Sequence, residues 1–203
     1  MNRVKFLFLV LIISLLFSCL SSPDTKYQAS TKLRDIAIKY NLKKYAENEF
    51  NDAEKDYAQA KSYMDSKKNF KADRLLDQVN KKYQLVLDKG FPPATEDKSK
   101  ETQDKIKMAN DIKANVAVKD LYSDAQKSYD DANKLKDAKD YPNAIDTYSA
   151  AEGKFDNVYT TAKDKMERAE KSIATTDQAF KDFEKSSQEI QKRYNDLSSD
   201  KTN

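Results

Sequence analysis

In a chain of 203 residues, 37 basic and 34 acidic side chains leave a formal net charge of +3, which excludes the strong basic excess typical of nucleic-acid-binding proteins. The chain has no histidine, so it lacks the commonest general base and transition-metal ligand, and its two glycines, Gly90 and Gly153, lie too far apart for a phosphate-binding loop. We therefore expect no enzymatic activity, no catalytic, cofactor-binding or metal-binding residues, and no nucleic-acid partner.

The first predicted element is a signal peptide over residues 1–18. Arg3 and Lys5 give the N-terminus a short positive region, and an apolar run interrupted only by Ser14 follows over residues 6–17. This run is shorter than the ~20 apolar residues of a membrane-spanning helix, and its length is typical of the apolar part of a signal peptide.

The apolar run ends in Leu16-Phe17-Ser18-Cys19, which resembles the lipobox of bacterial lipoproteins. The resemblance implies that Cys19, the only cysteine, carries a diacylglycerol, and that residues 19–24 tether the mature chain to a lipid bilayer. Because each buried CH₂ contributes ~0.8 kcal/mol, two or three acyl chains give a stable anchor. The alternative is an uncleaved N-terminal anchor in which Cys19 is incidental. Removal of Arg3 and Lys5 with the signal peptide leaves 35 basic against 34 acidic residues, a charge of +1.

Residues 25–91 are predicted to form a first unit of three helices. Asp24 or Thr25 can cap the first helix, and the following sequence is rich in helix-forming residues and shows no strand-like alternation. We expect the three helices to lie near residues 25–41, 43–66 and 70–89. The third helix is expected to end at Gly90-Phe91-Pro92-Pro93, because glycine favours a helix terminus and proline interrupts a helix.

Residues 92–171 are predicted to repeat this unit at an offset of 72 positions. The expected helices lie near 96–115, 118–138 and from 142 onward, where Pro142 is tolerated in a first turn. The matched positions are aromatic or small in both halves, such as Phe50 with Tyr122, Tyr57 with Tyr129, Tyr83 with Phe155, Ala53 with Ala125 and Ala72 with Ala144. Chance similarity between two helical stretches rich in alanine and lysine is the alternative.

Residues 172–203 are predicted to form a capping helix that covers the exposed end of the repeat, followed by a polar tail. The helix carries the apolar residues Ala179, Phe180, Phe183, Ile190 and Tyr194. The a and d positions of a heptad are not apolar throughout this stretch, which speaks against a coiled coil. The oligomeric state is left open by this pattern.

The segment containing Tyr141, Ala144 and Tyr148 resembles the second helix of a tetratricopeptide repeat, in which a small alanine lets helices approach closely. The first unit has the related sequence Phe70-Lys71-Ala72, and the 72-residue offset is close to twice the ~34-residue period of that repeat. In Tyr45-Ala46, Phe50, Ala53, Tyr57 and Ala60, followed by Asn69-Phe70, the chain also resembles a family of bacterial envelope lipoproteins of unknown function. These resemblances imply an all-α, elongated helical-hairpin repeat that contacts a protein partner.

Most of the 12 tyrosines lie on predicted apolar faces and are expected to pack in the core. Tyr63, Tyr141 and Tyr159 are instead the candidate partner-binding residues, since tyrosine is enriched at binding hot spots.

The sequence thus predicts a lipid-anchored interaction scaffold or assembly factor of the bacterial cell envelope, on the periplasmic face of the outer membrane or on the cell surface. The alternative is a surface-displayed lipoprotein that binds a host or environmental ligand.

Overall fold

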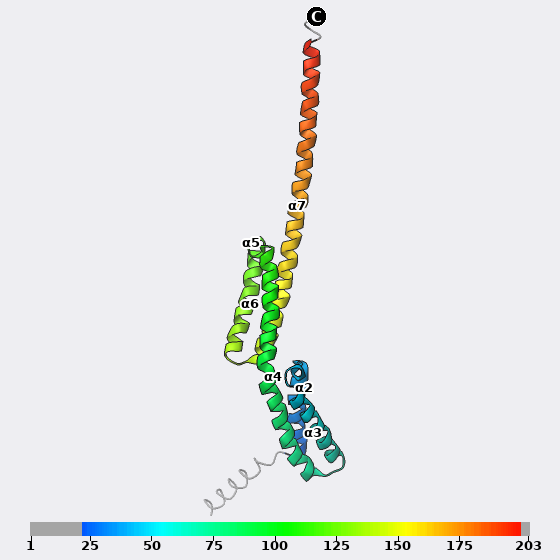
Figure 1. The fold of residues 1–203 in the computed structure, drawn as a ribbon, viewed down its shortest axis with the longest axis vertical. Helices are drawn as coiled ribbons and strands as arrows, with labels where there is room; N and C mark the ends of the chain where they lie inside the picture. Colours follow the sequence, from blue (N-terminus) through cyan, green and yellow to red (C-terminus); the bar gives the residue numbers. More distant parts are fainter. Residues whose placement is uncertain (1–21, 200–203) are drawn as a thin grey trace, which may run out of the picture. The chain divides into compact units, whose positions relative to one another are not determined.

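The computed structural model describes residues 22–199, so the predicted signal peptide and residues 19–21 of the tether, Cys19 included, lie outside the described residues. From Ser22 to Ser199 the chain is helical with no strand, which confirms the all-α prediction (Figure 1). The elements are α2 (Pro23–Lys39), η1 (Leu42–Lys44), α3 (Glu47–Asp65), α4 (Asn69–Asp111), α5 (Ala114–Ala117), α6 (Lys119–Asp137) and α7 (Tyr141–Ser199). No helix within this range combines the length and apolarity needed to cross a bilayer.

The N-terminus of α2 is fixed by a local cap. The Ser22 side chain accepts a hydrogen bond from the Thr25 backbone N–H at 3.3 Å, and Pro23 occupies the first helical position. Both features are favourable there, because the first amides of a helix have no partner within the helix. The helix therefore begins before Asp24 and Thr25, which the sequence had suggested as caps.

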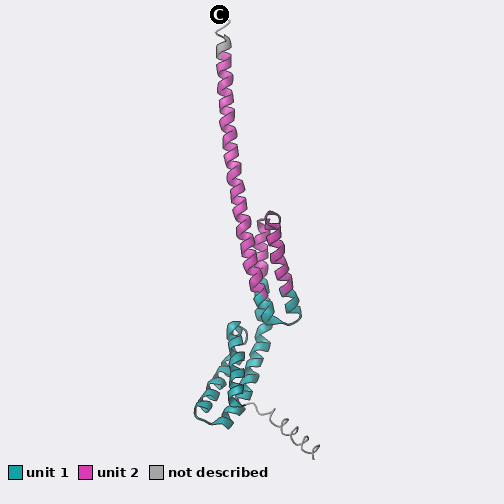
Figure 2. Ribbon diagram, turned by 180° about the vertical axis from the view of Figure 1, so that it is seen from behind, with its two compact units in different colours: residues 1–100, 132–146 teal, residues 101–131, 147–203 magenta. Residues whose placement is uncertain are grey.

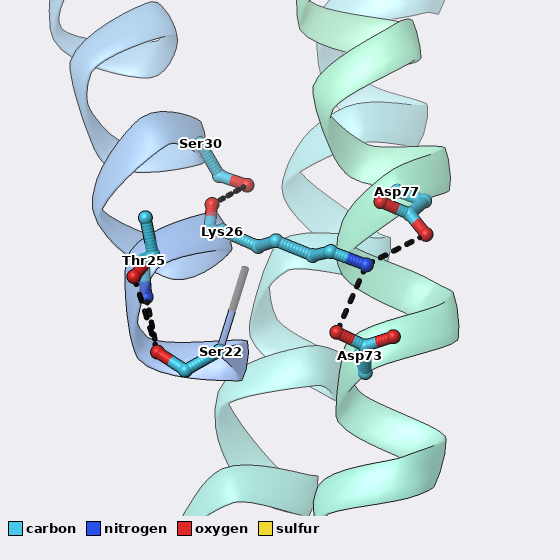
Figure 3. Close-up of polar contacts among 6 residues, drawn as sticks. All are labelled: Ser22, Thr25, Lys26, Ser30, Asp73 and Asp77. Atoms are coloured by element: carbon cyan, nitrogen blue, oxygen red, sulfur yellow. Dashed lines mark hydrogen bonds and ion pairs between the residues drawn. The ribbon is translucent and has the colours of Figure 1, made fainter. Parts of the chain in front are cut away.

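The described chain divides into two compact units, shown in Figure 2. Unit 1 comprises residues up to 100 together with 132–146, and it packs α2, α3 and the first part of α4 around one apolar core. Its fully buried members include Leu42, Leu76 and Tyr83. Figure 3 shows how Lys26 reaches from α2 to Asp73 and Asp77 on α4, with a distance of 2.9 Å to each carboxylate.

Unit 2 comprises residues 101–131 together with those from 147 onward. Its core has the same plan with smaller side chains, in which Phe155 and Val158 of α7 pack among alanines from α4, α5 and α6. The edge-to-face pair of Tyr122 and Phe155, at 5.6 Å between ring centroids, corresponds to the pair of Phe50 and Tyr83 in unit 1, at 6.2 Å.

The turns of the two copies of the repeat correspond residue by residue at the 72-position offset. Asn41 and Lys113 both adopt positive φ, at 52° and 55°, directly before η1 and α5. Lys67 and Lys139 adopt φ of 57° and 60° before α4 and α7 begin. The bounds of α6, Lys119–Asp137, likewise match those of α3, Glu47–Asp65. The two copies of the repeat therefore build their helices from the same turn positions.

The expected helix end at Gly90-Phe91-Pro92-Pro93 is not observed. Helix α4 continues through this segment, so the expected boundary between residues 91 and 92 falls inside a helix. Both prolines lie on the exposed face, while Phe91, Ala94 and Thr95 continue a buried stripe with helical spacing. Burial of this stripe outweighs the loss of the two proline N–H donors, as tertiary packing commonly overrides local propensity.

Gly90 serves close packing of two helical segments, and its φ is not positive. A Cβ atom added at Gly90 would lie 2.8 Å from the Cβ atom of Leu42, closer than real Cβ contacts allow. The corresponding positions in unit 2 are the buried pair Ala114 and Ala162. The two units thus fill the same crossing with leucine and glycine in one case and with two alanines in the other.

Helix α7 is unbroken from Tyr141 to Ser199, and its second half does not act as a cap. Every residue from 163 to 195 is exposed, and Figure 1 shows this part of α7 extending beyond α5 and α6 with no helix beside it. The expectation that this segment covers the end of the repeat was therefore wrong.

Candidate partner-binding groove

An open groove lies in unit 1 between α3 and the start of α4. It has a volume of about 490 Å³. The side chains that line it are Asp56, Gln59, Tyr63, Phe70, Lys71, Arg74, Leu75 and Gln78. We refer to it below as the α3–α4 groove.

The turn between α3 and α4 creates this groove. Lys67 takes up its positive φ after α3 ends, and the Lys68 amide donates to the Tyr63 carbonyl at 2.8 Å. The chain then reverses into α4, which brings Phe70 to the same groove as Tyr63. Of the three tyrosines predicted to bind a partner, Tyr63 is the one that the structure places in this groove.

Phe70 is the main apolar group of the groove. Its side chain is 75% exposed, although it lies on a helix that buries Ala72 and Leu76 completely. An exposed phenylalanine in a groove can insert into a partner and bury most of its surface, as aromatic anchors do at interaction hot spots. The sequence placed Phe70 in a tetratricopeptide-like segment and predicted no binding role for it.

Two cations flank the aromatic side chains. The Arg74 guanidinium carbon lies 5.9 Å from the centroid of the Phe70 ring, and Lys71 Nζ lies 5.9 Å from that of Tyr63. The one lining carboxylate, on Asp56, is paired with Lys82 at 2.8 Å. Because neither Lys71 nor Arg74 pairs with a carboxylate in the described part of the chain, the groove has a cationic rim.

The corresponding surface of the second copy of the repeat, at the start of α7, has a different chemistry. At the 72-position offset, Phe70 is replaced by Pro142, Lys71 by Asn143 and Arg74 by Asp146. Asp146 accepts hydrogen bonds from Lys39 Nζ at 2.9 Å and from the Tyr40 hydroxyl at 3.0 Å, both within unit 1. The first copy of the repeat therefore has an aromatic and cationic groove that the second copy lacks, although the helices of the two copies match.

The other two predicted tyrosines do not join this groove. Tyr141 stacks on Phe91, with 6.5 Å between ring centroids, and packs against the core of unit 1. Tyr159 lies on α7 in unit 2 and is half-buried. Sequence reasoning missed Phe70, Lys71 and Arg74. Their departure from the otherwise matching second copy is the signal that would have found them.

A second polar cluster in unit 1 has a structural role. Glu54 accepts hydrogen bonds from Arg34 Nε at 2.6 Å, from Arg34 Nη2 at 3.2 Å and from the Tyr83 hydroxyl at 2.6 Å. Burial alone would raise the pKa of Glu54, but these hydrogen bonds lower it below its usual value. Burial and the hydrogen bond to Glu54 raise the pKa of Tyr83. Arg34, Glu54 and Tyr83 are thus hydrogen-bonded to one another, and the cluster joins α2, α3 and α4.

Between residues 22 and 199, no three or more acidic or cysteine side chains gather as a metal site would require. No model of a known protein family matches the chain, and a comparison with characterised proteins finds no similar sequence.

Proposed function

We propose that this protein is a lipid-anchored interaction module of the bacterial cell envelope, without enzymatic activity. Its α3–α4 groove binds a partner segment that combines an apolar anchor with acidic side chains. The observation that carries this proposal is Phe70, three-quarters exposed in a groove whose rim carries Lys71 and Arg74. The apolar ring supplies contact area, and the two cations favour an acidic partner.

The scaffold role draws further support from the helical hairpins. In the tetratricopeptide-like segment, Ala144 and Tyr148 are fully buried, as the close approach of two helices requires. We propose that the α3–α4 and α6–α7 hairpins are distant structural counterparts of tetratricopeptide hairpins. Hairpins of this kind offer a partner helical surfaces that remain accessible when the core is packed.

Anchoring is supported by the sequence Leu16-Phe17-Ser18-Cys19, which ends three residues before the cap of α2 at Ser22. Lipid on Cys19 would confine the groove to a membrane surface and raise its effective concentration there.

The test is a crosslinking pull-down from intact cells that compares the wild type with the double variant F70A/R74E. We expect recovery of a discrete envelope partner to fall at least ~10-fold, since the loss of a hot-spot side chain commonly costs ~2 kcal/mol or more. Both substituted side chains are exposed, so the helix content measured by circular dichroism should not change.

The matched control is L85A/K81E, which makes the same kinds of change at exposed positions of α4 outside the groove. Equal recovery from F70A/R74E and the control would rule out the groove as the binding site. If no envelope protein is captured and external protease removes the protein from intact cells, the alternative of a host or environmental ligand is favoured instead.

A further inference from the structure

The second half of α7 carries an unusual concentration of exposed apolar side chains. Exposed fractions range from 45% for Met166 to 70% for Phe183. The six large residues of this group are Met166, Ile173, Phe180, Phe183, Ile190 and Tyr194. They account for half of the exposed large apolar residues of the described chain.

These residues lie on a single heptad seam. Counting Met166 as position a, the a positions continue with Ile173, Phe180, Ser187 and Tyr194, and the d positions are Ala169, Thr176, Phe183 and Ile190. The spacing alternates between three and four without interruption, as in helices that pair along a coiled coil. Three of the nine positions are small or polar, and this had obscured the pattern in the sequence. We call residues 166–194 the α7 seam.

The α7 seam has no packing partner within the described chain. None of its residues is buried, whereas most helical stability in proteins comes from tertiary packing of an apolar face. The apolar stripe runs for about 43 Å along the helix, at 1.5 Å per residue, and contiguous exposed apolar patches commonly mark interaction surfaces.

The charges beside the seam indicate a second copy of the same chain in parallel orientation. The e positions are Glu170, Asp177, Glu184 and Gln191, whereas none of the g positions Ser172, Ala179, Ser186 and Arg193 is acidic. In a parallel pair each e position faces a g position of the partner, so the acids meet side chains that are neutral or basic. In an antiparallel pair the e positions face each other, and the carboxylates would repel.

The area of the seam is sufficient for a dimer. Phe180, Phe183 and Tyr194 from two copies provide six aromatic side chains, each about two-thirds exposed. At ~150–250 Å² for a fully buried aromatic side chain, these alone supply on the order of 600–1,000 Å². With Met166, Ile173 and Ile190 the interface reaches the ~1,200–2,000 Å² of a stable complex.

We propose that residues 166–194 of α7 pair with the same segment of a second copy as a parallel, in-register, two-stranded coiled coil. Ser187 at an a position and Thr176 at a d position favour one register over the others, as polar residues in a coiled-coil core do.

The first experiment measures molar mass by light scattering for the mature chain with Cys19→Ser, which removes the acylation site and prevents dimers through a disulfide. We expect the mass of two chains. In F180E/F183E the seam acquires facing carboxylates, and the mass should fall to that of one chain. The control Q178E/Q188E adds the same two charges on the opposite face of α7 and should remain dimeric.

The orientation is tested by adding S187C or Q178C to the Cys19→Ser chain and oxidising it. Only a parallel, in-register pair brings two a-position residues within the ~7 Å between Cα atoms that a disulfide requires. We expect a crosslinked dimer from S187C and little from Q178C.

Three results would overturn the proposal: a wild type with the mass of one chain, a dimer that persists in F180E/F183E, or no crosslink from S187C. A monomeric wild type that captures a different protein through the seam would assign the seam to that protein.

Discussion

Glu54 links α2, α3 and α4 through a cluster that has no equivalent in unit 2. At the corresponding positions Arg34 becomes Ile106, Glu54 becomes Gln126 and Tyr83 becomes Phe155. The same helical plan therefore tolerates either a satisfied polar cluster or an apolar replacement. Removing one member of the polar cluster is expected to be destabilising, because the remaining groups lose their hydrogen-bond partners.

We predict that Glu54→Gln lowers the free energy of unfolding by about 1–3 kcal/mol at neutral pH, since it weakens the three charge-assisted hydrogen bonds that the carboxylate accepts. The lowered pKa of Glu54 in the folded state gives the sign of the pH dependence. The stabilisation is fully present above the ordinary carboxyl pKa near 4.5 and is lost as the pH falls through the lower folded value.

Urea denaturation at a series of pH values measures this difference. Wild type and Glu54→Gln should differ clearly at neutral pH and converge in acid. The control Gln126→Ala changes the matching position of unit 2 and should differ from the wild type by a constant amount. A difference for Glu54→Gln that is unchanged in acid would show that the carboxylate charge does not contribute.

At the scale of single residues, the sequence predicts which side chains are buried better than it predicts their hydrogen-bond partners. The core position of Tyr83 follows from the spacing of apolar residues on one helix face, and the structure confirms it. Its hydrogen bond to Glu54 joins residues 29 positions apart on different helices. No spacing rule within one helix encodes such a contact.

At the scale of the element, Gly90 shows why α4 does not end where its local sequence suggests. Glycine and the two following prolines favour a helix terminus in isolation, but the buried stripe continues through Phe91 and Ala94. The sequence located α3 and α6 well because their apolar faces and bounding turns agree. It mispredicted a helix end at Gly90, because glycine and proline both favour helix termination locally. The long-range contact of Gly90 with Leu42 cannot be read from the local sequence.

We predict that Gly90→Ala destabilises the protein by about 1–3 kcal/mol, because the added methyl group collides with Leu42. This cost exceeds the ~0.5–1 kcal/mol that alanine gains over glycine inside a helix. In a Leu42→Ala background the same substitution should be stabilising, since the pair then reproduces Ala114 and Ala162 of unit 2.

A double-mutant cycle of thermal or urea unfolding checks this reversal of sign. Ala162→Gly serves as the control, and it should be destabilising because the helix loses an alanine without relieving any contact. If Gly90→Ala has the same sign with leucine and with alanine at position 42, the close approach of the two segments is not the reason for the glycine.

At the scale of the whole molecule, the sequence predicts helix class and repetition better than it predicts the binding surface. The α3–α4 groove depends on two helices joined by a turn, and Tyr63 was the one predicted residue that reached it. The role of the C-terminal segment was mispredicted because a capping function was assumed, and the exposure of the α7 seam became visible only in the structure.

The proposed membrane anchor is also a property of the whole molecule, and Cys19→Ala tests it. We expect the variant to lose incorporation of labelled palmitate and to move from the membrane fraction to the soluble fraction, because the acyl chains supply the anchoring free energy. Ser21→Ala, downstream of the predicted cleavage site, should retain both properties. Membrane association that persists in Cys19→Ala would favour the uncleaved N-terminal anchor.

Helices α4 and α7 begin at equivalent points of the repeat, and this has a consequence for protein engineering. Residues 69–140 run from the start of α4 to the turn directly before Tyr141, so the segment begins and ends at the same place in the plan. A copy inserted between Asp140 and Tyr141 creates only one new peptide junction, between Asp140 and a second Asn69. In an array extended in this way, each junction would combine a turn and a helix start that both occur in the natural chain.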